Sequence, residues 1–222
     1  MAVTATLSNH FKYQAYKLGL DLSADSIKVL LMRSAFAFNK DNHAKKINVI
    51  NTQTHITYAI TAGLALTDSD SGFITDGFVP GMSVHIDGFT EGGNHATKII
   101  STVVAGTIVF TDTTGLVAEI AGDSVTIAGN DELAAGGGYL RDTKVLASLV
   151  LTEDDSNDRA EMTCANVIWT AAAGSIGPTP GALLYDDTSA DDTIIGYIDF
   201  GGEQTAPDGA DFTISNLKIR LS

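Results

Sequence analysis

The pattern of apolar and polar residues predicts one short helix followed by many β-strands. Apolar residues recur at helical spacing near the amino terminus, at Leu7, Phe11, Ala15 and Leu18, which places one apolar stripe against a core. Thr6 or Ser8 is available as the N-cap, and Gly19 is positioned to end the helix. No later segment carries a convincing helical period.

The remaining apolar runs are short, and their pattern is typical of β-strands. Residues 27–32 are predicted to form a strand buried on both faces, and the polar residues 34–55 a long loop. Short strands separated by glycine-containing turns are then expected at 73–75, 82–86, 97–100, 107–111 and 124–127. A second series is expected at 145–151, 160–164, 167–170, 182–185, 194–200, 212–215 and 217–221.

The two series of strands predict two domains, one inserted in the other. The early strand at 27–32 needs partners, and the simplest topology pairs it with the carboxyl-terminal series. We therefore expect a β-sandwich host domain formed by 1–58 and 130–222, with 59–129 inserted as a small β-barrel or sandwich. Residues 56–59 and 125–128 are expected to pair as the closing strands of the insert, and Gly136, Gly137 and Gly138 to form a flexible hinge.

Composition agrees with a globular protein that needs no disulfides. The chain has 222 residues, of which 44% are hydrophobic and 18% charged, so it is long enough to bury its own core. Its single cysteine, Cys164, excludes an internal disulfide, a zinc site built from several cysteines and CxxC redox chemistry. We expect Cys164 to be a small buried apolar residue, and the single tryptophan, Trp169, to pack in the core.

The net charge of −14 opposes binding to nucleic acid or to anionic membranes. No apolar run reaches the roughly 18 residues of a membrane span, and no signal peptide is evident, so the protein is expected to remain in the cytosol where it is made unless something carries it out. The charge is uneven: residues 1–50 carry seven basic and three acidic side chains, a balance of +4, which leaves −18 for the remainder. We therefore predict a partner-binding loop at Lys40, His43, Lys45 and Lys46.

The acidic turns are the candidate metal sites, and in each the solvated turn is the favoured interpretation. Asp68-Ser69-Asp70-Ser71-Gly72 has the D-x-D-x-G spacing of a calcium loop, but Phe73 and Val79 occupy the positions that need glycine and glutamate. Two further acidic turns, Asp154-Asp155-Asp158 and Asp186-Asp187-Asp191-Asp192, are expected to be solubilising hairpin tips, with a bound divalent ion as the alternative.

No motif predicts catalysis. The five histidines, at 10, 43, 55, 85 and 95, fit no metal-ligand pair, there is no GxSxG nucleophile motif, and the glycines at 136–138 lack the lysine and helix of a phosphate loop. We therefore predict a non-enzymatic protein with no catalytic residue, no cofactor and no metal. A hydrolase and a carbohydrate-binding module remain alternatives, although the tyrosines are too dispersed along the chain to argue for a sugar-binding face.

Several segments resemble a widespread group of small virion proteins of tailed bacteriophages. The resemblance covers roughly residues 5–55 and 130–222. It is carried by Ser8-Asn9-His10-Phe11, residues 18–31, Phe38-Asn39-Lys40-Asp41-Asn42-His43, Ala165-Asn166-Val167-Ile168-Trp169-Thr170-Ala171, Ala182-Leu183-Leu184-Tyr185-Asp186-Asp187, residues 195–202 and residues 208–214. The middle block, with Gly77-Phe78, residues 81–84 and Gly93-Asn94-His95, resembles a small β module that phage structural proteins carry as an addition.

The resemblance implies a jelly-roll-like structural protein of the virion, assembled in the host cytoplasm. Capsid decoration or cement is the expected role, with other virion proteins as partners, the major capsid protein foremost, and a homo-oligomer as the expected state. A tail, baseplate or fibre-associated component is the alternative.

Overall fold

The computed structural model describes residues 5–16, 21–157 and 159–221 and shows an all-β protein. One helix, α1 (Asn9–Tyr16), and two short 3₁₀ turns, η1 (Lys46–Asn48) and η2 (Gly92–Asn94), accompany the strands. The predicted fold class, antiparallel β-sandwich with one short amino-terminal helix, is confirmed. The chain divides into two compact units: a host unit of 1–45 and 132–222, and an insert unit of 46–131.

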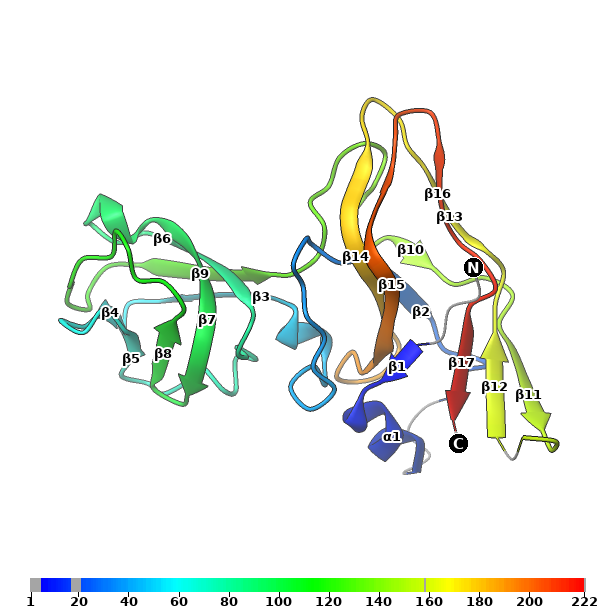
Figure 1. Cartoon of the computed structure of the whole chain (residues 1–222). Coiled ribbons are helices and arrows are strands. Elements are labelled where there is room, and N and C mark those ends of the chain that lie inside the picture. Colours follow the sequence, from blue (N-terminus) through cyan, green and yellow to red (C-terminus); the bar gives the residue numbers. More distant parts are fainter. Residues whose placement is uncertain (1–4, 17–20, 158, 222) are drawn as a thin grey trace. The chain divides into compact units, whose positions relative to one another are not determined.

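The host unit is built from three antiparallel sheets. Its largest sheet has the order β1-β15-β14-β2-β10, with bounds Ala5–Leu7, Ile194–Ala206, Ile176–Asp186, Ile27–Leu31 and Lys144–Val145. The second sheet joins β11 (Val150–Asp154), β12 (Arg159–Thr163) and β17 (Lys218–Leu221), and the third pairs β13 (Val167–Thr170) with β16 (Asp211–Ile214). In Figure 1 the two long strands β14 and β15 run side by side.

Strand β2 lies where the sequence pattern placed it. It is paired on one side with β14, with Leu30 opposite Leu183, and on the other with the two-residue strand β10. Ile27, Leu30 and Leu31 are completely buried. Burial on both faces explains why the segment lacks the alternation of a half-exposed strand, and the predicted pairing with the carboxyl-terminal series is confirmed.

The host core is aromatic around the only tryptophan. Trp169 is buried and its ring centroid lies 6.1 Å from Phe212 and 6.0 Å from Tyr139, while Phe200 lies 5.7 Å from Phe212. Aromatic pairs at these separations add to the stabilisation from apolar burial. The prediction that Trp169 packs in the core is therefore confirmed.

The insert unit is a seven-stranded antiparallel sheet with its own core. The order is β3-β9-β6-β7-β8-β5-β4, with bounds Ile50–His55, Val125–Asn130, Ser83–Asp87, Ala96–Val104, Thr107–Phe110, Leu66–Asp68 and Tyr58–Ile60. Tyr58 stacks on Phe73 at 5.4 Å, and Phe73 meets Phe78 edge to face at 5.8 Å. All three rings are buried, so this unit has an apolar interior of its own.

The insert begins earlier than the pattern indicated. Strand β3 lies inside the segment expected to be a loop, and it pairs with β9 from Ile50 opposite Asn130 to His55 opposite Val125. This ladder, not one between 56–59 and 125–128, closes the unit, and the compact division therefore falls at 46 and 131 instead of 59 and 129. The polar residues of β3, such as Thr52 and Gln53, hid the strand, because only one side of an edge strand needs to be apolar.

Other local predictions also need correction. Leu7 belongs to β1 rather than to the helix, and Ser8 is the residue that caps α1; the expected end of the helix, at Leu18 and Gly19, lies outside the described residues. Residues 73–75 form turns rather than a strand, although Phe73 is fully buried. An apolar residue that closes a core from a turn cannot be told from a strand residue by composition.

Of the three consecutive glycines, Gly137 and Gly138 are closely packed, whereas Gly136 has open space at its Cβ position, so the segment is not an open hinge throughout. A Cβ atom on Gly137 would lie 2.2 Å from the carbonyl oxygen of Ser175, and one on Gly138 would lie 2.5 Å from that of Thr170. Both glycines have positive φ, +56° and +85°. Glycine is needed there for left-handed backbone and for close approach of two chain segments.

Candidate functional site

The predicted partner-binding residues are divided between the two units. The side chain of Lys40 is 53% exposed, and its Nζ lies 3.2 Å from Asp41; the Nζ of Lys45 lies 3.2 Å from Oδ2 of Asp191. Lys46 begins η1 and belongs to the insert unit, whereas the other three belong to the host unit. Lys40 and Lys45 are therefore the two members that keep part of their side chain exposed on the host unit.

His43 was predicted to belong to the partner-binding loop, and this prediction is wrong because the residue is buried. Its ring packs between Phe36 and Phe38, at centroid distances of 5.2 and 5.5 Å, and it is 2% exposed. Its Nδ1 accepts a hydrogen bond from the backbone N–H of Asn39 at 3.0 Å. Burial lowers the pKa of His43 to about 4, so the ring is neutral at pH 7 and organises the loop from within.

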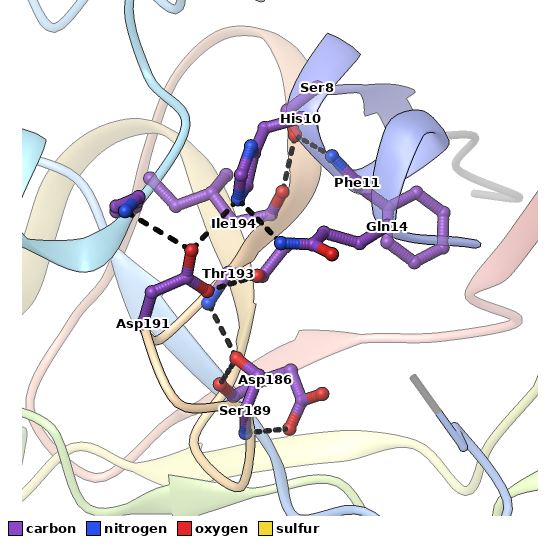
Figure 2. A network of polar contacts seen from close by, with 10 residues as sticks. Ser8, His10, Phe11, Gln14, Asp186, Ser189, Asp191, Thr193 and Ile194 are labelled. Atoms are coloured by element: carbon purple, nitrogen blue, oxygen red, sulfur yellow. Dashed lines mark hydrogen bonds and ion pairs between the residues drawn. The ribbon is translucent and has the colours of Figure 1, made fainter. Parts of the chain in front are cut away.

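A polar cluster, which we name the clasp, joins three segments of the host unit. It comprises Ser8, His10 and Gln14 at α1, Lys45, and four residues at the connection between β14 and β15, Asp186, Ser189, Asp191 and Thr193 (Figure 2). Asp191 is its centre, with His10 and Gln14 extending toward it from α1. His10 and Asp191 are 181 positions apart, so no spacing in the sequence signals their contact.

The carboxylate of Asp191 is saturated by neighbours. Its Oδ2 lies 3.0 Å from Nε2 of His10 and 3.2 Å from Nζ of Lys45, and its Oδ1 accepts a hydrogen bond from Oγ1 of Thr193 at 2.6 Å. Burial raises the pKa of this carboxyl, but the hydrogen bonds from Thr193, His10 and Lys45 outweigh it and hold the pKa below its ordinary value. Asp191 is therefore ionised and ties the three segments together.

The acidic turn that precedes β15 is held by hydrogen bonds between its own residues. Oδ1 of Asp186 accepts hydrogen bonds from the backbone N–H groups of Thr188 at 2.8 Å and Ser189 at 3.2 Å. The hydroxyl of Ser189 donates to the carbonyl of Asp186 at 2.9 Å and accepts from the N–H of Thr193 at 2.8 Å. These bonds are those of a capped turn, and within the described ranges no group of three histidine, cysteine or acidic residues is arranged to hold a metal ion.

Ser8, His10 and Asp191 resemble a catalytic triad in composition but not in geometry. The Ser8 hydroxyl accepts a hydrogen bond from the N–H of Phe11 at 3.0 Å and donates to the carbonyl of Ile194. The residue is completely buried, as expected for an N-cap wedged between a helix and a strand. A nucleophilic serine needs its proton directed at the imidazole and its oxygen open to substrate, and Ser8 offers neither.

The D-x-D-x-G motif of the insert is also a turn. Oδ1 of Asp68 accepts hydrogen bonds from the Thr57 hydroxyl at 2.7 Å and the N–H of Asp70 at 3.0 Å, and Oδ2 accepts from the N–H of Gly72 at 2.9 Å. Both carboxylate oxygens of Asp68 are thus occupied by hydrogen bonds from the chain itself, one from a side chain and two from the backbone. The favoured interpretation as a turn agrees with these contacts, but Asp68 is buried, at 3% exposed, and is not solvated as expected.

Comparison with protein-family models, with curated proteins and with solved structures finds no match. Over the residues that the structure describes, no helix is long and apolar enough to cross a membrane.

Proposed function

We propose that the protein is a non-enzymatic structural component of a tailed-bacteriophage particle, with capsid decoration or cement on the major capsid shell as its role. The observation that carries this proposal is the clasp. Its serine hydroxyls, its carboxylate at Asp191 and its imidazole all serve to fix chain segments. The resemblance of residues 5–55 and 130–222 to phage virion proteins supplies the biological setting.

A protein that reinforces a shell needs strand edges and exposed contact residues, and the host unit has both. Strand β11 lies at the edge of its three-stranded sheet, and Val150 and Leu151 on it are 51% and 45% exposed. Edge strands with exposed apolar side chains favour association with other chains. This surface suits assembly into a particle.

The buried tyrosines argue against a carbohydrate-binding module. Tyr58, Tyr139 and Tyr185 are each at most 1% exposed, and the hydroxyl of Tyr139 donates to Glu132 at 2.6 Å. Sugar-binding modules present aromatic rings to solvent, whereas these three rings are buried, and those of Tyr58 and Tyr139 belong to the two cores. A tail, baseplate or fibre-associated position is the second candidate, because it would use the same edges.

The copy number of the chain per purified particle tests the proposal. Quantitative mass spectrometry of virions, with the major capsid protein as internal reference, should give hundreds of copies for a decoration protein. A handful or a few dozen copies would move the protein to the tail, and its absence from washed particles would overturn the virion assignment. A saturable turnover of ester, peptide or glycan that disappears on mutating a single Ser, His, Asp or Glu would overturn the non-enzymatic assignment.

The basic residues of the host unit give a second test. Replacing Lys40 and Lys45 with Ser should lower occupancy on particles and weaken its salt dependence, because exposed charges are screened beyond a Debye length of about 8 Å. The matched control is Lys144→Ser, which removes a lysine from β10 of the same unit. Equal occupancy of all three proteins over a broad salt range would exclude Lys40 and Lys45 from the interface.

A further inference from the structure

A groove of about 550 Å³ opens between β15 and β16 of the host unit. It is lined by residues of β15, the 207–210 turn, β16 and Ser215. Phe200 and Phe212 form its apolar floor, with ring centroids 5.7 Å apart, and Gln204, Asp211 and Thr213 present exposed polar side chains along it. The volume is within the range of about 300–1,000 Å³ typical of binding sites.

The groove exists because two consecutive strands do not pair with each other. A connection as short as 207–210 ordinarily joins the two strands of a hairpin. Here β15 pairs with β14, with Gln204 opposite Thr179, while β16 pairs with β13, with Phe212 opposite Trp169. Within the described parts of the chain, β16 therefore has a neighbouring strand on one side alone.

The β15 side of the groove is irregular, which leaves β16 as the regular edge. The pairing of β15 with β14 shifts register between Thr179 and Gly181, and Gly201 and Gly202 have φ values of +74° and +146°. A bulge of this kind interrupts a ladder. By contrast, β16 is an unbroken strand with alternating exposed and buried residues.

The residues that line the groove include one acidic side chain, Asp211, and no basic one. Residues 199–215 contain four acidic side chains, Asp199, Glu203, Asp208 and Asp211, and no lysine, arginine or histidine. All four are exposed. A segment that binds here meets the exposed carboxylate of Asp211 beside an apolar lining, with three more exposed acidic residues in the same chain segment. Charge complementarity therefore favours basic side chains alternating with apolar ones.

We propose that this groove is the docking site for an extended basic segment of a neighbouring chain, which adds to the free edge of β16 as a third strand. Its backbone pairs with Asp211–Ile214, its apolar side chains face Phe200 and Phe212, and a basic side chain faces Asp211. The identification of the neighbour as another virion protein rests on the proposed function. The expected chemistry of the bound segment follows from the groove alone.

Two synthetic peptides test the chemistry without any particle. Acetyl-Lys-Val-Lys-Val-Lys-amide is titrated into the ¹⁵N-labelled full-length protein, with acetyl-Glu-Val-Glu-Val-Glu-amide as the matched control. The basic peptide should shift the amide signals of 204–206 and 211–215 in a saturable way, and the shifts should weaken as salt is raised. Equal effects of both peptides, or no effect of the basic peptide at these residues, would overturn the proposal.

Charge reversal at Asp211 makes this test more specific. Asp211→Lys should weaken binding of the basic peptide by up to about fivefold, the size expected for exposed ion pairs. Asp155→Lys changes the net charge equally at an exposed turn outside the groove, and should leave the affinity unchanged. The same loss in both variants would show that net charge alone attracts the peptide, which contradicts a defined site.

One further variant distinguishes a partner from the chain's own amino terminus. If removing residues 1–4 shifts the signals of 204–206 and 211–215 before any peptide is added, the groove is filled within the chain and the proposal is wrong. Failure of the virion assignment would show instead as absence from particles, with the peptide result intact. The two failures are therefore distinguishable.

Discussion

The insert and host units reach the same all-β architecture with opposite dependence on distant contacts. The insert is one continuous stretch, and its longest side-chain bond given by the structure joins Thr54 to Thr126, 72 positions apart. The host consists of two segments joined by bonds such as that of Ser8 to Ile194, 186 positions apart. A continuous unit can close its core alone, whereas the host needs its clasp and its pairing of β2 with β14 to join its halves.

The most severe test of this comparison is deletion of the insert at two different boundaries. Replacing 46–131 with a short Gly/Ser linker should leave a folded, cooperatively melting host unit, because β2 keeps β14 and β10 as partners. Replacing 59–129 should give a less soluble chain, because it removes nearly all of β9 and leaves the edge of β3 without its partner strand. Solubility and thermal melting distinguish the two; an insoluble product from the first deletion would show that the units depend on each other.

Core truncations should next show whether the units unfold separately. Phe73→Ala in the insert should cost about 3–5 kcal/mol, and Leu184→Ala in the host about 2–5 kcal/mol, since both side chains are completely buried. Trp169, the only tryptophan, lies in the host and reports on that unit alone. Its fluorescence transition should move with Leu184→Ala and stay fixed with Phe73→Ala; movement with both would mean one cooperative unit.

Acid should weaken the host through His43. The folded-state pKa of His43 is about 4 and its ordinary value is 6.5, so between these pH values the unfolded chain binds a proton that the folded chain excludes. The free energy of unfolding therefore has its full value above about pH 6.5 and falls by about 3 kcal/mol as the pH drops toward 4. Denaturant titrations followed at Trp169 between pH 7.5 and 4.5 measure this, and His43→Gln should flatten the slope. An unchanged slope in that variant would assign the acid sensitivity to other groups.

The smallest expected effect concerns the packed glycines of the host. Gly138→Ala should destabilise the host unit by about 1–3 kcal/mol, because its φ is +85° and the new Cβ would overlap the carbonyl of Thr170. Gly209, with φ +81° and open space around its Cβ position, is the matched control, and Gly209→Ala should cost less. Equal melting temperatures would mean that residues 136–138 give way easily, as a hinge does.

The sequence predicted the elements that rest on local chemistry. Ser8 was available as a cap and caps α1, 27–32 was apolar enough for a strand buried on both faces, and Trp169 is in the core. These features depend on residue type and short-range spacing, which the chain displays directly. The polar strand β3 escaped notice because its identity depends on β9, and Phe73 misled because a buried turn residue has the composition of a strand residue.

By itself, therefore, the sequence determined an all-β chain with an early helix and an inserted block. Only the tertiary structure decided which polar residues meet. It placed Asp191 against His10 and Lys45 and buried His43 between two phenylalanine rings. It also paired β15 and β16 with other strands and not with each other, which leaves a groove between them. The physical reason is that these contacts join positions far apart in the chain, where choice of partner follows from sheet order and not from spacing.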